Sequence, residues 1–252
     1  MIGRRAAMAA LLGLCLLAAA PPSGADEPEL RICTTGDYRP LTFRDPATGQ
    51  YDGIDIDMAR DLAATLGRAP VFVATTWPTL TQDLTTPGRC DIAMGGISIT
   101  PARRQVGEFT APYLPSGKVP ITQSASGGRF ATLDAINQPG VEVIENPGGT
   151  NEQFAREHFP RADISIWPDN ATIFDELAAS HADVMITDAI EARYQAARHP
   201  GLVAVNPDQP FTEDAKAYWL PGGSPLPGQV DAWLQKAMAD GVFAGFYDRW
   251  MA

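Results

Sequence analysis

Histidine and cysteine are scarce in this chain, with three of each among 252 residues. His158, His181 and His199 are far apart in the sequence, and no histidine and cysteine cluster has the spacing of a metal site. A phosphate-binding loop and a dinucleotide fingerprint are missing too, so we expect no cofactor and no metal. Only Cys33 and Cys90 follow the N-terminal segment, too few for a disulfide framework. Both lie in apolar runs, which favours two small buried side chains; a disulfide bridge is the alternative.

Basic residues are outnumbered by acidic ones, 19 against 30. Arg4 and Arg5 lie in an N-terminal segment without acidic residues, so removing it leaves 17 basic residues against 30 and a formal charge of −13. This balance argues against nucleic acid as a partner, because nucleic acids favour basic surfaces. It does not exclude a small anionic ligand, because the donors inside a cleft decide local binding.

The first 25 residues have the pattern of a signal peptide. Arg4 and Arg5 are followed by an apolar stretch over residues 9–20, and Ala25 is a small residue suited to cleavage. The apolar stretch is too short to span a bilayer well. We therefore expect export to the periplasm as a soluble protein without a stable membrane anchor. The pattern leaves open whether the protein forms oligomers.

Strand and helix signals alternate along the rest of the chain, which indicates α/β layers. Pro78 and Pro101 are expected to open helices, and Asn170 is expected to cap one. The predicted strands of a first set are 30–34, 71–73 and 91–94, and those of a second set are 141–144, 164–167 and 184–186.

Two α/β units, the second inserted into the first, account for this order. We place the first domain at residues 26–119 and 212–252 and the second at residues 120–211. Two thin crossings, near 119–121 and 211–215, would connect them. Such an arrangement leaves a central cleft with a hinge, where a small-molecule substrate would bind.

The segment Thr187–Arg193 follows the apolar run 184–186 and begins a helix. Ligands of α/β proteins bind at such junctions, just outside the carboxyl ends of strands. Asp188 and Glu191 are three residues apart there, which is the spacing of a capping box. Spacing alone favours capping over catalysis, although a bare carboxylate at this position suits proton donation.

Longer segments resemble the bacterial extracellular solute-binding proteins of family 3, which are polar amino-acid receptors of the periplasm. The resemblance lies in Thr35–Phe43, Tyr51–Asp57 and Asp91–Ser98 together with Arg103. It implies a type II periplasmic-binding-protein-like fold, in which two domains enclose a ligand. It also implies that Arg103 binds a ligand carboxylate, which suits a guanidinium fork, and that Asp188 meets a ligand ammonium.

A narrower group within this family, the periplasmic cyclohexadienyl dehydratases, is similar in further segments. These enzymes convert prephenate to phenylpyruvate and arogenate to phenylalanine. The resemblance implies a carbon–oxygen lyase on a receptor fold, with Glu191 as general acid and no cofactor. The alternative is a non-catalytic polar amino-acid-binding protein of an ABC transporter. The similar segments are Gly117–Lys118, Asn146–Glu152, Pro168–Phe174, Thr187–Arg193 and Gln209–Phe211.

Each residue of the predicted site has a chemical reason and a structural alternative. Glu191 would have to be desolvated to keep a proton at neutral pH, because an ordinary glutamate has a pKa of about 4.3. Lys118 could hold a substrate carboxylate or stabilise charge at the departing hydroxyl; a solvated surface lysine is the alternative. Gly149, Thr150 and Asn151 form a loop at a helix N-terminus, whose free N–H groups favour anions. Capping of that helix by Thr150 is the alternative.

Five further residues complete the predicted substrate site. Asp37 and Tyr38 follow the first strand, and Asp37 would accept a hydrogen bond from the substrate or order its own loop. Trp77 would cover the substrate ring or pack on the core. Ser98 would donate to a carboxylate, and Gln209 belongs to a segment shared with the dehydratases.

Overall fold

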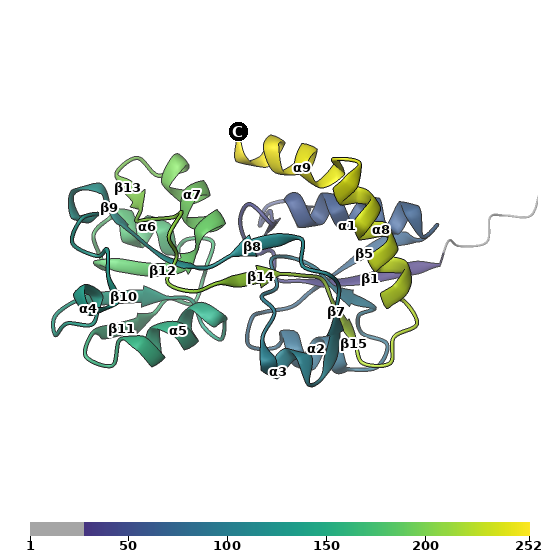
Figure 1. The fold of residues 1–252 in the computed structure, drawn as a ribbon, viewed down its shortest axis with the longest axis horizontal. Coiled ribbons are helices and arrows are strands. Elements are labelled where there is room, and N and C mark those ends of the chain that lie inside the picture. The colour runs from purple at the N-terminus through teal and green to yellow at the C-terminus, as the bar shows by residue number, and fades with distance from the viewer. Residues whose placement is uncertain (1–27) are drawn as a thin grey trace, which may run out of the picture.

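Two mixed β-sheets organise residues 28–252, the part of the chain that the computed structural model describes. Figure 1 shows them as two α/β lobes, side by side along the long axis of the molecule. The predicted signal peptide, residues 1–25, lies outside the described residues. None of the helices in residues 28–252 combines the length and the apolar character that a membrane span requires.

The first sheet combines parallel and antiparallel strands. β1 (Glu29–Thr34) pairs in parallel with β5 (Ala69–Ala74) and β6 (Ile92–Ala93). β15 (Trp219–Pro221) pairs antiparallel with β6 and with β7 (Gly107–Phe109), so the order is β5-β1-β6-β15-β7. Because β15 comes from the last part of the chain, the C-terminal segment completes the lobe that the N-terminal segment begins.

The second sheet has the order β11-β10-β12-β9-β13. β10 (Glu142–Glu145) pairs in parallel with β11 (Asp163–Ile166) and β12 (Val184–Asp188). β9 (Lys118–Gln123) pairs antiparallel with β12 and with β13 (Leu202–Ala204). Every residue of the central strand β12 is buried, so its carboxyl end delivers a side chain to the interior of the molecule.

An antiparallel pair of strands, β8 (Leu114–Ser116) and β14 (Asp214–Lys216), connects the two lobes (Figure 1). The crossing expected at 119–121 lies inside β9 instead, because that segment pairs with β12 in the second sheet. The crossing expected at 211–215 overlaps β14. The assignment of 26–119 with 212–252 to one domain and of 120–211 to the other stays a prediction.

Local signals set the ends of several helices. Gly53, which precedes α1, has a φ of 133° that favours glycine, and Gly67, with a φ of 62°, follows the end of this helix. Thr100 accepts a hydrogen bond from the Arg103 N–H and caps α3. The α-helices are α1 (Ile54–Thr65), α2 (Leu80–Thr85), α3 (Pro101–Arg104), α4 (Leu133–Ile136), α5 (Thr150–His158), α6 (Ile173–Ala178), α7 (Ala189–Arg198), α8 (Pro227–Ala239) and α9 (Val242–Met251). The remaining elements are the 3₁₀ helix Ser124–Ser126 and a small sheet of β2 (Asp37–Tyr38), β3 (Thr42–Arg44) and β4 (Tyr51–Asp52).

Two of the predicted helix starts are wrong. Pro78 precedes α2 and lies in a turn, and the helix begins at Leu80. Asn170 does not cap α6, which begins at Ile173. The Asn170 side chain donates instead to the backbone carbonyl of Asp37 at 2.9 Å. Asn170 therefore connects the second lobe to the first.

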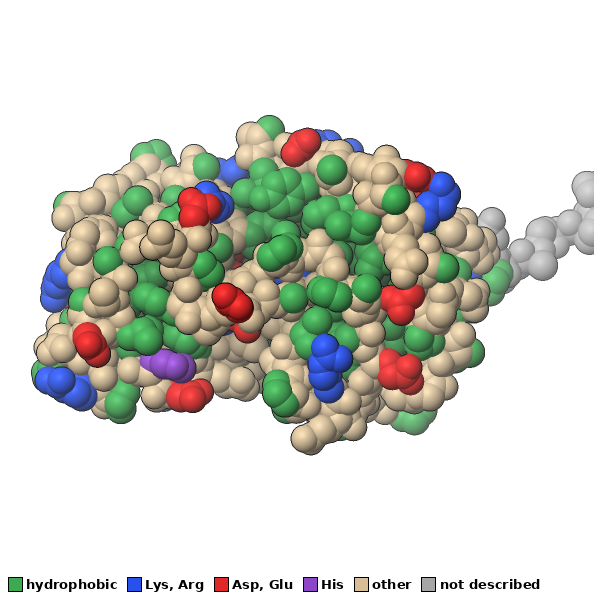
Figure 2. Space-filling model, in the orientation of Figure 1, with side chains coloured by type: hydrophobic (Ala, Val, Ile, Leu, Met, Phe, Trp, Pro, Cys, Tyr) green, Lys and Arg blue, Asp and Glu red, His purple; other side chains and the backbone are tan. Residues whose placement is uncertain are grey.

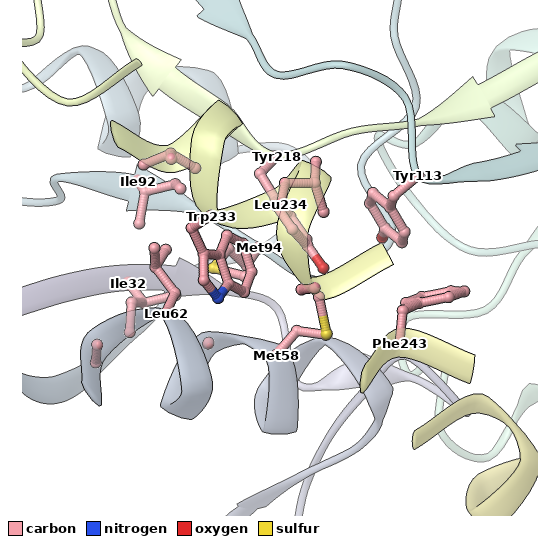
Figure 3. Close-up of a cluster of buried hydrophobic side chains, with 14 of the residues drawn as sticks. Ile32, Met58, Leu62, Ile92, Met94, Tyr113, Tyr218, Trp233, Leu234 and Phe243 are labelled. Atoms are coloured by element: carbon pink, nitrogen blue, oxygen red, sulfur yellow. The ribbon is translucent and has the colours of Figure 1, made fainter. Parts of the chain in front are cut away.

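Figure 3 shows a hydrophobic cluster of the first lobe, in which side chains from α1, α8 and the neighbouring strands point toward one another. Tyr113 and Tyr218 stack in it with ring centroids 4.6 Å apart. Their hydroxyls donate to the buried Asp55 carboxylate at 2.5 and 3.1 Å, and the Gly96 N–H donates to it at 2.6 Å. Burial raises the pKa of Asp55 to about 6. The core of this lobe thus holds the backbone of Gly96 in a defined position.

A disulfide joins Cys33 and Cys90. The prediction of two unpaired cysteines is therefore wrong, although both side chains are buried as expected. Cys33 lies in β1, and Cys90 precedes β6, which pairs in parallel with β1. Neighbouring strands bring the two Cα atoms within 5.7 Å, a distance that a disulfide can span.

Charged side chains are scattered over the face of the molecule drawn in Figure 2. They lie singly or in small groups on both lobes, while hydrophobic side chains gather near the middle of this face. This face therefore presents no continuous basic area to a polyanion.

Candidate active site

A pocket lies between the lobes. Asn146 follows β10 and Asp188 ends β12, so the cavity is at the carboxyl ends of these parallel strands, where α/β proteins bind ligands. The first lobe contributes Tyr38, Trp77, Gly96 and Ser98 to its wall. The second lobe contributes Asn146, Gly149, Thr150, Asn151, Asn170 and Asp188, and the connecting strand β14 contributes Lys216. Within residues 28–252, no group of three or more His, Cys, Asp or Glu side chains could hold a metal ion.

Asp188 is the centre of a buried ionic network at this cavity. Its Oδ1 accepts from Lys118 Nζ and from Ser116 Oγ, each at 3.1 Å. Its Oδ2 accepts from Lys216 Nζ at 2.5 Å and from the Tyr38 hydroxyl at 2.6 Å. Burial alone would raise the pKa of Asp188, but the two ammonium groups hold it well below its usual range. Asp188 is therefore an anion.

The capping role that spacing alone favoured for Asp188, as the alternative to ligand binding, is not observed. Asp188 does occupy the N-cap position of α7, but its side chain makes no capping hydrogen bond. The reason is that the donors of the ionic network already occupy both carboxylate oxygens. Proximity in the folded chain therefore overrides the local pattern.

Lys118 and Lys216 are almost completely buried, with 3% and 1% of their surface exposed. The whole sequence contains three lysines, and a lysine is rarely buried unless it is paired. Lys118 Nζ also donates to Thr150 Oγ1 at 2.9 Å and to Asn151 Oδ1 at 2.5 Å. Lys216 Nζ donates to Ser98 Oγ at 2.8 Å. Lys118 is thus not a solvated surface lysine, and Ser98 accepts a hydrogen bond here.

The loop between β10 and α5 positions the partners of Lys118. Gly148 has a φ of 76°, and a Cβ on it would lie 2.5 Å from the Pro78 ring, so this close approach requires glycine. Glu152 accepts from the Gly148 N–H at 2.6 Å and stabilises the start of the helix. Thr150 does not cap α5, because its hydroxyl accepts from Lys118 instead. The loop therefore presents side-chain oxygens to a buried cation.

Glu191 lies in the first turn of α7 and is fully buried. Its Oε2 is 2.5 Å from Thr187 Oγ1, whereas its Oε1 has no hydrogen-bond partner among the described residues. Burial raises the pKa of Glu191 well above its usual range; the Thr187 hydrogen bond opposes this effect and the Asp188 charge adds to it. The neighbours Ile190 and Ala192 pack into different hydrophobic clusters, so the glutamate lies between two apolar regions. Glu191 is outside the cavity lining, and its raised pKa favours the protonated form.

Two aromatic side chains form one wall of the cavity. The rings of Tyr38 and Trp77 meet edge to face, with centroids 5.8 Å apart. A Cβ on Gly96 would lie 2.3 Å from the Tyr38 ring, so the ring can occupy this position only beside glycine. Tyr38 and Trp77 both line the cavity, and their faces suit a flat ligand ring.

Besides Glu191, four residues of the predicted site do not line this cavity: Asp37, Arg103, Lys118 and Gln209. Asp37 lines two neighbouring surface pockets instead, and burial raises its pKa. Arg103 donates from Nη1 to the backbone carbonyl of Ser98 at 2.9 Å, and burial lowers its pKa to about 10. Gln209 is exposed, because its N–H closes a turn with the Asn206 carbonyl that holds it at the surface. Arg103 is therefore a buried cation that contacts a residue of the cavity wall, Ser98, without lining the cavity itself.

Four lining residues are missing from the predicted site: Gly96, Asn146, Asn170 and Lys216. Asn170 was expected to cap a helix, which is an equally good local use of asparagine. Lys216 had a detectable signal, because it is the one charged residue in the run 215–220, which is otherwise apolar. An isolated lysine in such a run is expected to be buried and paired.

The family follows from a match over nearly all of the described chain. Residues 30–252 match the family model of the bacterial extracellular solute-binding proteins, family 3. The chain belongs to this family. For a family 3 solute-binding protein, the two α/β lobes with mixed sheets are the expected fold, and the fold class predicted from the sequence is confirmed.

Relatives of this family 3 protein include both an enzyme and binding proteins. A cyclohexadienyl dehydratase of Pseudomonas aeruginosa is 48% identical over 222 residues, which cover 88% of this chain and 82% of that protein. The L-cystine-binding protein TcyJ of Escherichia coli is 21% identical over 221 residues, with coverage of 88% and 82%.

Similar solved structures also include both a binding protein and an enzyme. The ancestral amino acid-binding protein AncCDT-1, a precursor of cyclohexadienyl dehydratase, is 35% identical with a TM-score of 0.81, covering 89% of this chain and 96% of that one. The ancestral cyclohexadienyl dehydratase AncCDT-3 is 47% identical with a TM-score of 0.54, covering 88% and 92%.

Proposed function

We propose that this chain is an exported cyclohexadienyl dehydratase that works in the periplasm as a carbon–oxygen lyase. It would convert prephenate to phenylpyruvate and arogenate to phenylalanine. Similarity over 88% of the chain to a dehydratase supports this function. The single observation that carries it is Glu191, a fully buried glutamate with a raised pKa and one oxygen that has no hydrogen-bond partner within residues 28–252.

The reaction requires one proton at one oxygen. As the ring carboxylate leaves as carbon dioxide, the electrons of its carbon–carbon bond enter the ring. The carbon–oxygen bond to the ring hydroxyl breaks, and the hydroxyl takes the Glu191 proton and leaves as water. The ring becomes aromatic, which supplies much of the driving force. General acid catalysis of this kind contributes about 10²–10⁴-fold to the rate.

The cationic side of the cavity would hold the substrate for this step. Lys118 donates to Thr150, Asn151 and Asp188, so it would act through its charge, on a substrate carboxylate or on the departing hydroxyl. The N–H groups at the start of α5 would add donors. Tyr38 and Trp77 would fix the plane of the ring. The strand pair β8–β14 would act as the hinge that lets substrate enter between the lobes.

The direct test is to incubate the purified exported chain with prephenate and to measure phenylpyruvate. The expected result is product formation in proportion to protein concentration, and phenylalanine formation from arogenate in a parallel assay. No product at high protein concentration, together with tight binding of a polar amino acid, would show a solute receptor of an ABC transporter instead. The two readings therefore predict different results in one pair of measurements.

A further inference from the structure

The acceptor capacity of Asp188 is filled before any ligand enters the cavity. A carboxylate accepts about four hydrogen bonds. Asp188 already receives four, from Lys118, Lys216, Ser116 and the Tyr38 hydroxyl, at distances of 2.5 to 3.1 Å. An ammonium group of a ligand would therefore find this carboxylate occupied.

The charges around the cavity are also not balanced. One buried carboxylate, Asp188, faces two buried ammonium groups, of Lys118 and Lys216. A single lysine would neutralise it, so the second leaves an excess of one positive charge. Arg103 is a third cation near the site. The pKa of Lys216 is lowered mainly by burial, then by the charge of Lys118, and least by the charge of Arg103. Glu191 adds no negative charge while it holds its proton.

We infer that Lys216 is a substrate-binding residue that makes the cavity select a 2-oxo dicarboxylate over the amino analogue, which means prephenate over arogenate. The inference rests on the proposed function, because that function supplies the two substrates. They differ in one group: prephenate has a carbonyl where arogenate has an ammonium. The carbonyl can accept from Lys216, which uses two of its three Nζ donors on Ser98 and Asp188, whereas the ammonium is repelled by both lysines.

Two other acceptors could receive the ammonium of arogenate. Asn170 lines the cavity, and its Oδ1 has no partner among the described residues, but a neutral amide does not offset the excess positive charge. Asp37 is a carboxylate, but it lies outside the cavity lining. The lysine pair therefore decides the preference.

The test compares the affinities of prephenate and arogenate by calorimetry in the chain carrying Glu191→Gln, which is expected to stop turnover. We expect prephenate to bind at least about tenfold tighter, a difference of about 1.4 kcal/mol. Adding Lys216→Met should reduce this ratio at least about tenfold, mainly by weakening prephenate binding. The matched control is Lys236→Met, which changes an exposed lysine and should leave the ratio as it is.

Three outcomes would overturn the inference: tighter binding of arogenate in the starting protein, no binding of either compound, or an unchanged ratio after Lys216→Met. If arogenate binds tighter and Asp37→Asn removes that preference, Asp37 is the ammonium site instead. Lys216→Gln is a second neutral variant in case the methionine variant does not fold, as judged by thermal unfolding. Turnover by the unmodified chain is measured separately. If the chain binds prephenate more tightly than arogenate but forms no phenylpyruvate, the proposed dehydratase activity is wrong, while the inferred binding preference still holds.

Discussion

Asp188 and Glu191 lie one helical turn apart at the start of α7, and both are almost completely buried. Asp188 is held as an anion by two lysines, whereas burial, and after it the charge of Asp188, raise the pKa of Glu191 and favour its neutral form. The comparison shows that burial alone does not set a charge state; the partners within hydrogen-bond distance do. One short segment thereby supplies both a fixed anion that holds the cations and a neutral acid that can donate a proton.

The largest effect should come from removing the acid. Glu191→Gln keeps the shape of the side chain but has no proton to donate to a leaving hydroxyl, so kcat should fall by about 10²–10⁴-fold while prephenate still binds. Phenylpyruvate formation and calorimetric binding measure the two quantities. Glu157→Gln, at an exposed position of α5, is the control. Near-normal turnover by the Glu191 variant would exclude it as the general acid.

The anion should matter most for stability. Asp188→Asn would leave two buried ammonium groups without a counter-charge, which should lower the free energy of unfolding by about 3–5 kcal/mol. Urea unfolding measures the loss, and adding Lys216→Met should recover part of it. The control is Asp240→Asn, which removes an exposed ion pair with Lys236 and should cost at most about 1 kcal/mol. A similarly small loss for Asp188→Asn would show that water reaches the network.

The two acids should also affect stability in different pH ranges. The pKa of Glu191 is raised from an ordinary 4.5, so above that pH the unfolded chain releases a proton that the folded chain keeps. The free energy of unfolding should therefore fall as pH rises from 4.5 toward the folded pKa, by up to about 1.4 kcal/mol per pH unit. The contribution of Asp188 has the opposite sign: it is present above its ordinary pKa of 3.8 and lost as pH falls below that value.

Subtracting the stability curve of Glu191→Gln from that of the unmodified chain isolates the glutamate. The subtraction removes the contributions of Asp55 and Glu145, whose pKa values burial also raises. A difference that does not change with pH above 4.5 would mean that Glu191 ionises normally in the folded protein.

The smallest effect should come from the hydroxyl next to the acid. Thr187→Val removes the hydrogen bond that lowers the pKa of Glu191, so the pH at which kcat declines on the alkaline side should move upward. Stability should fall by about 1 kcal/mol. Thr187→Ser keeps the hydroxyl and should leave the pH profile unchanged. If the alkaline decline of kcat moves to lower pH in the valine variant, this hydrogen bond raises the pKa of Glu191 instead of lowering it.

Much of the fold could be predicted from the sequence, because local signals were strong. Apolar runs at 30–34 and 184–186 are strands β1 and β12, and the glycine at position 67 follows the end of α1. Predictions failed where the use of a residue depended on distant partners. Asn170 bonds to the backbone of Asp37 in the other lobe, and Cys33 meets Cys90 only because β1 and β6 are neighbours.

The candidate site likewise contains residues that the sequence pointed to and residues that it missed. Tyr38, Trp77, Ser98 and the 149–151 loop line the cavity; of these, the sequence placed Tyr38 after a strand and the loop at a helix N-terminus. Lys216 was missed because its partner Asp188 is 28 residues earlier in the chain, and no spacing rule connects them. Gln209 belongs to a segment that resembles the dehydratases, yet its side chain is exposed.

The sequence by itself determined the α/β order of elements, the family, and the presence of two carboxylates at the start of one helix. These properties depend on local patterns that are readable along the chain. Only the tertiary structure decided the charges of those carboxylates. A pKa depends on burial and on groups within a few ångströms, and here those groups come from both lobes and from the strand that connects them. Spacing assigned Asp188 to a helix cap; in the folded protein it is an anion that accepts from two lysines and two hydroxyls, beside a glutamate whose pKa is raised.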